Sequence, residues 1–322
     1  MNHHVENSTA KSGATIPSPG RPGPLRYVLI TPARNEATFI EQTIRAVVAQ
    51  TVNPLKWVIV SDGSTDGTDE IVHRYAAQHP WIELVRMPER TERHFAGKIL
   101  AFNAGYERMR GLDYDVIASL DADITFDLEY FSFLLGKLAA NPALGLVGTP
   151  FEDQGVSYDY RYVSIEHVSG ACQVFRRECF EAIGGYIPMK GGGVDHVAVL
   201  SCRMKGWKTR TFTDKKCVHH RVMGTAKHSG LASKFNIGKL DYALGGHPLW
   251  ELFRGVYQMT KKPFLVGGGA ILAGYFMSMV SGAKRPISDE LVRFRRGEQM
   301  VRLKRFLLRQ RNVPNAESAA GH

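Results

Sequence analysis

The chain has 322 residues, of which 44% are hydrophobic, and a formal net charge of +10 at pH 7. This length and apolar fraction suit a globular protein with a real core, organised as one large domain or two modest ones. The charge is uneven, because ten basic and three acidic residues lie between positions 284 and 311. Such a basic tail suits an anionic surface, either a membrane or nucleic acid.

Neither the cysteines nor the chain ends carry a recognisable functional motif. Cys172, Cys179, Cys202 and Cys217 have no CxxC spacing, so neither a zinc site nor a disulfide framework is indicated. They are expected to be buried small residues in a reducing compartment. Residues 1–25 are rich in Pro, Gly and Ser and lack the apolar core of a signal peptide. We expect residues 1–25 and the tail 312–322 to be disordered.

From Arg26 to Gly148, short apolar runs alternate with amphipathic helical patterns. This alternation predicts an α/β fold with a Rossmann-like, mostly parallel sheet flanked by helices. The expected strands are "YVLIT" (27–31), "KWVIVSD" (56–62), "IELVRM" (82–87), "DVIASL" (115–120) and "LGLVGT" (144–149). The expected helices cover 36–50, 69–78, 97–109 and 128–140.

Polar clusters follow three of these strands. "TPARNE" comes after the first, "SDGSTDGT" after the second and "DAD" after the fourth. Aspartates and DG pairs are common in turns, so each cluster alone has an ordinary explanation. However, ligands of parallel sheets bind beyond the carboxyl ends of the strands, and all three clusters fall at that edge. Asp121 and Asp123 would repel each other there unless a divalent cation and its anionic ligand offset the repulsion.

An ordered set of motifs carries a family resemblance. It comprises "TPARNEATFIEQTIRAVVAQT", "WVIVSDGSTDGTDEIV", "GKILAFNAG", "LDADITFD", "VSGACQVFRRECFEAIGGY" and "VDHVAVLSCRMKGW". Over residues 26–223 the chain resembles the inverting family-2 glycosyltransferases of bacterial, membrane-associated type, whose fold is called GT-A. The resemblance implies a nucleotide-sugar donor, in particular a UDP-sugar, and a divalent metal, Mn²⁺ or Mg²⁺.

The resemblance also implies roles for individual residues. Asp121 would orient the ribose and Asp123 would bind the metal. The other residues expected around the nucleotide sugar are Thr31, Pro32, Arg34, Glu36, Asp62 and Lys98. Glu36 could also cap its helix, Asp62 could serve a turn, and Lys98 could be a solvated lysine at a helix start. Asp66 is expected to cap the helix before "GTDEIV".

Two further positions come from the same comparison. Relatives carry Glu-Asp before the helix that ends in Gly-Trp, and here Val194 stands in place of the Glu. Asp195 remains, and it is the expected catalytic base that deprotonates the acceptor hydroxyl; its alternative role is a helix N-cap. A histidine of "CVHHRVMGT" is expected at the metal, and of the adjacent pair we choose His219 over His220.

The C-terminal third is expected to form a helical region, 231–311, after a catalytic domain, 26–230. Its segment 263–283 has no charge and is flanked by Lys and Arg on both sides. We expect a re-entrant or interfacial hairpin at the membrane, with a membrane span or packing on the core as alternatives. The enzyme would then act at the cytoplasmic face of the membrane, as a peripheral or monotopic protein.

The leading functional prediction is an inverting, metal-dependent glycosyltransferase acting on a glycan or lipid-linked acceptor, as in cell-surface polysaccharide synthesis. A sugar nucleotidyltransferase is the alternative enzyme, but "TPARNEA" lacks the glycine-rich loop of that class. A nucleotide-sugar binder without catalysis is motivated by Val194, and the retained Asp123 and Asp195 argue against it. No nucleic-acid partner is expected, because the basic tail has no reading motif.

Overall fold

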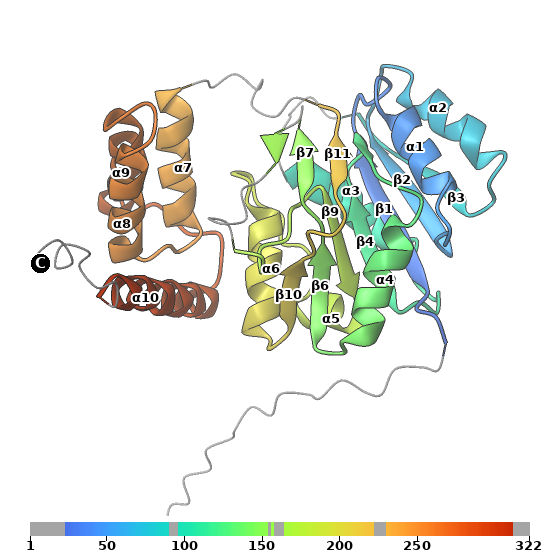
Figure 1. Cartoon of the computed structure of the whole chain (residues 1–322). Helices are drawn as coiled ribbons and strands as arrows, with labels where there is room; N and C mark the ends of the chain where they lie inside the picture. Colours follow the sequence, from blue (N-terminus) through green and yellow to red (C-terminus); the bar gives the residue numbers. More distant parts are fainter. Residues whose placement is uncertain (1–22, 90–95, 154–155, 158–163, 222–229, 312–322) are drawn as a thin grey trace, which may run out of the picture.

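The computed structural model describes residues 23–89, 96–153, 156–157, 164–221 and 230–311. An α/β domain forms one part of the molecule, and a group of helices, coloured orange to red in Figure 1, lies beside it. The segments expected to be disordered, 1–25 and 312–322, lie outside the described residues except for 23–25.

The main sheet has seven strands. In order across the sheet they are β10 (Lys208–Thr211), β6 (Leu144–Gly148), β9 (Cys172–Arg176), β4 (Val116–Leu120), β1 (Tyr27–Ala33), β2 (Lys56–Asp62) and β3 (Ile82–Met87). Only β9 runs antiparallel to its neighbours, β4 and β6. The predicted α/β architecture with a mostly parallel sheet is therefore confirmed, and β9 is a strand that the alternation did not predict.

Strand β1 shows how the core is divided between the two faces. Tyr27 and Leu29 join one hydrophobic cluster, and Val28 and Ile30 join the other. This follows because successive side chains of a strand point to opposite faces. The first face is covered by α1 (Ile40–Val48), α2 (Thr68–Ala76) and α4 (Tyr130–Ala140), and the second by α3 (Ala96–Glu107), α5 (Arg177–Ala182) and α6 (Val194–Met204).

A small second sheet brings distant segments together at the carboxyl edge of the first. Its strands are β5 (Ile124–Thr125), β11 (Cys217–His219), β7 (Phe151–Asp153) and β8 (Val156–Ser157). β11 is antiparallel to β5 and pairs His219 with Ile124. Because Ile124 directly follows the "DAD" motif, this register carries His219 to that motif.

The C-terminal helices are α7 (Leu231–Ala243), α8 (Pro248–Met259), α9 (Val266–Val280) and α10 (Asp289–Arg311). The uncharged run 263–283 contributes a single helix, α9, which packs against α7 and α8. The hairpin expected within this run is therefore wrong, because its central residues continue one helix without a turn. Among the described residues, no helix combines the length and the apolar character needed to cross a bilayer.

Glycines let these helices approach backbone to backbone. A Cβ at Gly238 of α7 would lie 1.9 Å from the carbonyl oxygen of Ile271, and one at Gly274 of α9 would lie 2.0 Å from that of Phe235. A Cβ at Gly268 would lie 2.2 Å from the carbonyl oxygen of Gly255. Close contacts through small residues are the packing mode that membrane helices also use. Gly268 and Gly274 of the apolar run therefore serve helix packing.

An ion pair joins the C-terminal helices to the α/β domain. Arg203 of α6 donates two hydrogen bonds of 2.8 Å to the carboxylate oxygens of Glu298 on α10. Leu291 and Val292 of α10 join the same hydrophobic cluster as Val197 of α6. The α10 helix is thus fixed to the helix that carries Asp195.

Gly274→Ala should destabilise the protein, because the added methyl group would collide with the backbone of α7. We expect a loss of about 1–3 kcal/mol in the free energy of unfolding, the range for overpacked sites, measured by urea denaturation.

Gly269→Ala is the matched control on the same helix, since no atom lies within 4 Å of the position that a Cβ would take there. It should leave stability unchanged or raise it by roughly 0.5–1 kcal/mol through helix propensity. Equal effects of the two substitutions would contradict the close-packing argument.

Candidate active site

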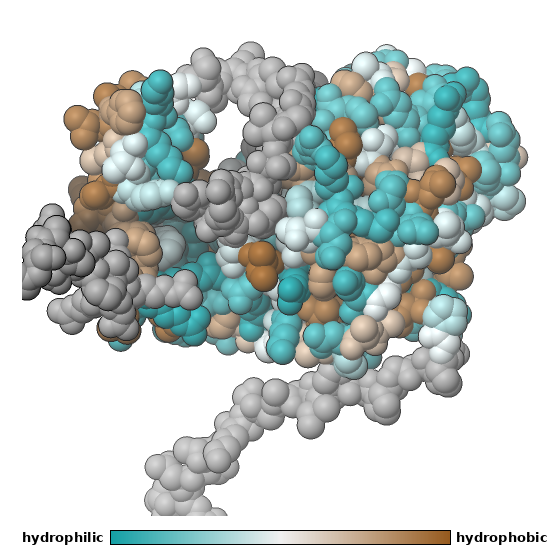
Figure 2. All heavy atoms as spheres, in the orientation of Figure 1, coloured by the Kyte–Doolittle hydropathy of each residue, from teal (hydrophilic) through white to brown (hydrophobic). Residues whose placement is uncertain are grey.

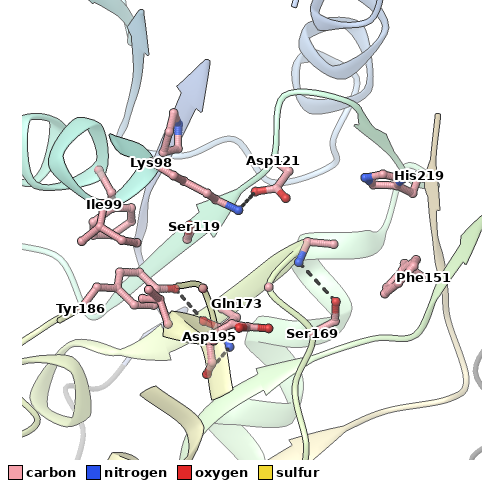
Figure 3. A pocket seen from close by; sticks show the side chains of 17 residues that line it. Lys98, Ile99, Ser119, Asp121, Phe151, Ser169, Gln173, Tyr186, Asp195 and His219 are labelled. Atoms are coloured by element: carbon pink, nitrogen blue, oxygen red, sulfur yellow. Dashed lines mark hydrogen bonds and ion pairs between the residues drawn. The ribbon is translucent and has the colours of Figure 1, made fainter. Parts of the chain in front are cut away.

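A cavity of about 310 Å³ opens at the carboxyl edge of the main sheet. Figure 3 shows Lys98 and Asp121 on one side, Asp195 facing them and His219 at one end. Five of the ten predicted site residues line this cavity: Pro32, Lys98, Asp121, Asp195 and His219. The other five, which are Thr31, Arg34, Glu36, Asp62 and Asp123, are not among its lining residues.

Lys98 and Asp121 form an ion pair within the cavity. Lys98 lies in the first turn of α3, and its Nζ donates to Asp121 Oδ1. Asp121 follows β4 directly, and its backbone N–H donates to the carbonyl oxygen of Ala171 at 3.0 Å. Lys98 is therefore not simply a solvated lysine, since it faces a carboxylate at a fixed place on the sheet edge. The pair thus places one positive and one negative charge side by side on the cavity wall.

Asp123 lies between an imidazole and a guanidinium. Its Oδ2 is 3.5 Å from His219 Nε2 and 3.3 Å from Arg221 Nε. Arg221 also donates to the carboxylate of Glu36. Burial raises the pKa of Glu36 to about 7, although the attraction of Arg221 opposes this rise. Glu36 thus pairs with Arg221 through its side chain, which makes no capping bond to α1.

Arg221 is a site residue that the sequence reasoning missed. Its only signal was a cation directly after the two histidines in "CVHHR". The pairing of β11 with β5 places it beside Asp123, and no local pattern predicts this pairing.

The two histidines have different surroundings. His220 Nε2 lies 2.8 Å from Thr125 Oγ1, and its ring stacks on Phe39. His219 lines the cavity beside Asp123, and its Nδ1 is buried without a hydrogen-bond partner in the described part of the chain. A buried polar atom of this kind calls for a bound group that satisfies it.

The donor set fits a divalent cation that also binds phosphate. Within the described ranges, no cluster of three or more His, Cys, Asp or Glu side chains is arranged to hold a metal. Mg²⁺ in nucleotide sites is usually held by one or two protein ligands together with phosphate oxygens and water. Asp123 offers one carboxylate for such a site, and the imidazole of His219 lies beside it.

The predicted nucleoside residues are split between the site edge and the core. Arg34 Nη1 lies 3.7 Å from Asp62 Oδ2, and the Asp62 side chain is almost fully buried at the end of β2. Thr31 is fully buried, and its hydroxyl accepts a 3.0 Å hydrogen bond from Trp57 Nε1. Thr31 therefore faces the core and fixes the end of β1. Asp66 accepts from the backbone N–H of Thr68 at 3.1 Å, but the N-cap residue of α2 is Gly67, so the cap expected at Asp66 is wrong by one position.

Asp195 is the second residue of α6 and lines the cavity. The residue before the helix is Gly193, and no side chain caps it, so the alternative capping role of Asp195 is not what the structure shows. A Cβ added at Gly170 would lie 3.2 Å from Asp195 Oδ2. The carboxylate thus rests against a backbone position where a side chain would crowd it.

The side chain of Gln173 on β9 contacts the first turn of α6. Its amide Nε2 donates to the carbonyl oxygens of Val168, at 3.1 Å, and Asp195, at 3.4 Å. Its Oε1 accepts from the Tyr186 hydroxyl at 2.7 Å. Gly170, Gln173 and Tyr186 were not predicted as site residues. They lie in "VSGACQVF" and "GGY", so the motifs that carried the family resemblance were the available signal.

Comparison with known proteins identifies the family of the chain. The family model described as glycosyl transferase family 2 matches residues 28–191. A dolichyl-phosphate beta-glucosyltransferase of Trichomonas vaginalis is 31% identical over 147 residues, which is 43% of this chain and 41% of that protein. The poly-beta-1,6-N-acetyl-D-glucosamine synthase of Staphylococcus aureus is 29% identical over 117 residues, 36% of this chain and 26% of its own length. The matches thus cover less than half of these relatives.

Solved structures share the fold. A mannosyltransferase from Pyrobaculum calidifontis, in complex with GDP-Man and Mn²⁺, has a TM-score of 0.53 at 21% identity over 92% of this chain and 84% of its own. TarS from Staphylococcus aureus, in complex with UDP-GlcNAc, has a TM-score of 0.52 at 13% identity over 80% of this chain and 73% of its own.

These structural neighbours confirm the predicted GT-A fold, and at such identities they carry nothing further. The family model covers half of the sequence and includes the "DAD" motif at the carboxyl edge of the sheet. The chain therefore belongs to glycosyl transferase family 2.

Proposed function

We propose that the protein is an inverting, metal-dependent glycosyltransferase that moves a sugar from a nucleotide sugar, in particular a UDP-sugar, to a glycan or lipid-linked acceptor. The observation that carries this proposal is one cavity that holds Lys98 and Asp121 opposite Asp195. Lys98 and Asp121 offer charged groups for the nucleoside diphosphate part of the donor. Asp195 offers a carboxylate that can accept a proton.

The two sides divide the chemistry of transfer. Asp121 and Lys98 would orient the donor, with Arg34 and Asp62 at the nucleoside end of the site. Asp123 and His219 would hold a divalent cation, Mn²⁺ or Mg²⁺, which supplies charge neutralisation to the departing diphosphate. Asp195 would take the proton of the acceptor hydroxyl as that hydroxyl attacks the sugar from the face opposite the leaving group, which inverts the anomeric centre.

The family and the ligands of the structural neighbours support a nucleotide-sugar donor. They do not distinguish between a uridine and a guanosine nucleotide. Of the structural neighbours, one was solved with GDP-Man and Mn²⁺ and another with UDP-GlcNAc. A thermal-shift screen of UDP- and GDP-sugars with Mn²⁺ would identify the donor, because a ligand that binds only the folded state raises its melting temperature. The family assignment argues against a nucleotidyltransferase, and turnover of any donor would exclude a binder without catalysis.

Asp195→Asn should lower turnover by at least about 10², because the amide is nearly isosteric but cannot accept the proton. Donor binding should stay intact, since Asp195 lies on the acceptor side. Turnover and donor affinity would be measured on the same preparation.

Asp214→Asn makes the same chemical change at an exposed carboxylate outside the cavity and should leave turnover unchanged. If Asp195→Asn retains near-normal turnover on the true acceptor, the base is another residue.

Metal and nucleotide binding should be coupled through Asp123 and His219. Asp123→Ala and His219→Ala should each remove most of the gain in UDP affinity that Mn²⁺ produces, because each would remove one of two protein ligands. Calorimetry of UDP binding with and without Mn²⁺ would measure this coupling.

The neighbouring His220→Ala serves as the matched control, since His220 contacts Thr125 and Phe39. It should keep most of the coupling. Loss of coupling in His220→Ala but not in His219→Ala would reverse the choice between the two histidines, and UDP affinity independent of Mn²⁺ in the wild type would reject the metal site.

The same proposal places the enzyme at a membrane surface, on the cytoplasmic face, as a peripheral or monotopic protein without a nucleic-acid partner. Exposed apolar side chains gather on the C-terminal helices, where Figure 2 shows hydrophobic surface. They include Leu249, Leu252 and Val256 of α8, Phe264 and Leu265 before α9, and Phe306, Leu307 and Leu308 of α10. The basic residues between 284 and 311 add attraction to anionic lipids.

The full chain should float with anionic vesicles, and high salt should reduce this binding without abolishing it. The basic residues contribute about 1 kcal/mol each near the surface and are screened by salt, whereas apolar insertion is not. The double substitution Leu252→Ser, Val256→Ser should lower the bound fraction that remains at high salt.

Leu55→Ser is the control, since Leu55 is similarly exposed but lies on the α/β domain. Equal loss of flotation in both variants, or no flotation of the wild type, would reject the membrane surface.

A further inference from the structure

A second cavity, of about 250 Å³, lies where α10 meets α6. Its lining side chains are Ser164, His167, His196, Arg203 and Arg302. We refer to it as the junction cavity. None of its lining residues is a carboxylate, and none lines the cavity that holds Asp195 and Lys98.

The two arginines differ in how their donors are used. Arg203 is committed to the structure, because Glu298 accepts two of its hydrogen bonds and the carbonyl of Glu166 accepts a third. Arg302 donates from Nη2 to Glu166 Oε2 at 2.8 Å, and its side chain is partly exposed. A guanidinium carries five N–H groups in a fork that matches a phosphate. Arg302 can therefore bind a further oxyanion that enters the cavity.

His196 contributes a polar atom that lacks a hydrogen-bond partner. Its Nε2 is shielded from solvent and has no hydrogen-bond partner within the part of the chain that the structure describes. Its ring centroid lies 5.7 Å from that of His167. Burial lowers the pKa of His196 well below its usual range, and repulsion from Arg295, His167, Arg203 and Arg302 acts in the same direction. An anion in the cavity would supply the missing partner and offset this repulsion.

The wall that carries Arg302 continues as an apolar surface. Phe306 lies four residues after Arg302 on α10 and hence on the same face, one turn further along. Phe306 and its neighbours Leu307 and Leu308 are exposed. A phosphate at Arg302 would thus have an apolar path beside it, which suits a phosphate that is attached to a hydrocarbon chain.

We propose that the junction cavity binds the phosphate monoester of an anionic lipid, with Arg302 and His196 contacting the phosphate and the lipid chain running along Phe306. His196 directly follows Asp195 on α6, so the bound phosphate lies at the helix turn that carries the proposed base. The inference goes beyond glycosyl transfer, because phosphate binding here needs neither the donor nor the metal.

Inorganic phosphate is the first probe, applied to the full chain and followed by calorimetry and by the ¹⁵N resonances of labelled histidines. Phosphate should bind and shift a resonance that His196→Gln removes. Arg302→Gln should weaken phosphate binding about tenfold, as expected for the loss of a charge-assisted hydrogen bond. Arg305→Gln removes the same charge from an exposed position of the same helix outside the cavity and should not change affinity.

Glu166→Gln separates ligand binding from a structural role of Arg302. It breaks the same ion pair as Arg302→Gln, but it releases the guanidinium and should therefore keep or raise phosphate affinity. Weakened binding in both variants, equal affinity in Arg302→Gln and Arg305→Gln, or no phosphate binding by the wild type would each overturn the proposal. UDP binding with Mn²⁺, measured on the same variants, should be unchanged, so failure here is distinguishable from failure of the glycosyltransferase assignment.

Vesicles then distinguish a lipid headgroup from free phosphate. Vesicles that contain phosphatidic acid, a phosphate monoester, are compared with vesicles of phosphatidylglycerol, a diester, adjusted to the same surface charge. The wild type should prefer phosphatidic acid, and Arg302→Gln should lose this preference while Arg305→Gln keeps it. Equal binding to both lipids would reject the lipid assignment even if free phosphate binds.

Discussion

The structure depends on the balance of charge at the carboxyl edge of the sheet. Glu36, Asp121 and Asp123 converge there, and like charges in a partly buried site repel one another. Lys98 offsets Asp121, and Arg221 offsets both Glu36 and Asp123. Each cation comes from a different element from the carboxylate it faces. This edge is therefore electrostatically satisfied only when these separate segments come together.

The same constraint bears on the proposed binding of a nucleoside diphosphate with a cation. Lys98, which neutralises Asp121, lines the cavity, and a bound divalent cation would take over part of the neutralisation of these carboxylates. Opposite them, Asp195 is held by backbone contacts through Gln173 and by close approach to Gly170. The proposed base is thus positioned by the rigid sheet strand β9, while the donor side is positioned by charge.

The C-terminal helices use a different stabilising principle. Glycines on α7, α8 and α9 bring backbones into contact, which leaves larger apolar side chains on the outer surface. The Arg203–Glu298 pair then fixes α10 to α6, the helix of Asp195. Exposed apolar side chains and the proposed catalytic base therefore belong to one continuous packing unit. The junction cavity lies inside that unit.

The sequence by itself determined the order of the helices and main-sheet strands up to β6, though not the short β5, and the three polar clusters, because these follow from local periodicity and from the rule that ligands bind at strand ends. The family resemblance of its motifs also singled out Asp195 and the "DAD" pair as candidate site residues. Only the tertiary structure decided the antiparallel insertion of β9, the pairing of Arg221 with Glu36 and Asp123, and the burial of Thr31. It also placed His219, which the sequence had already favoured over His220, next to Asp123. These depend on pairings between segments far apart in the chain, β11 with β5 and Thr31 with Trp57, which no local pattern encodes. The sequence also did not predict that α9 is a single helix. Glycines in an uncharged run are compatible both with a turn and with close helix packing, and the sequence does not distinguish the two.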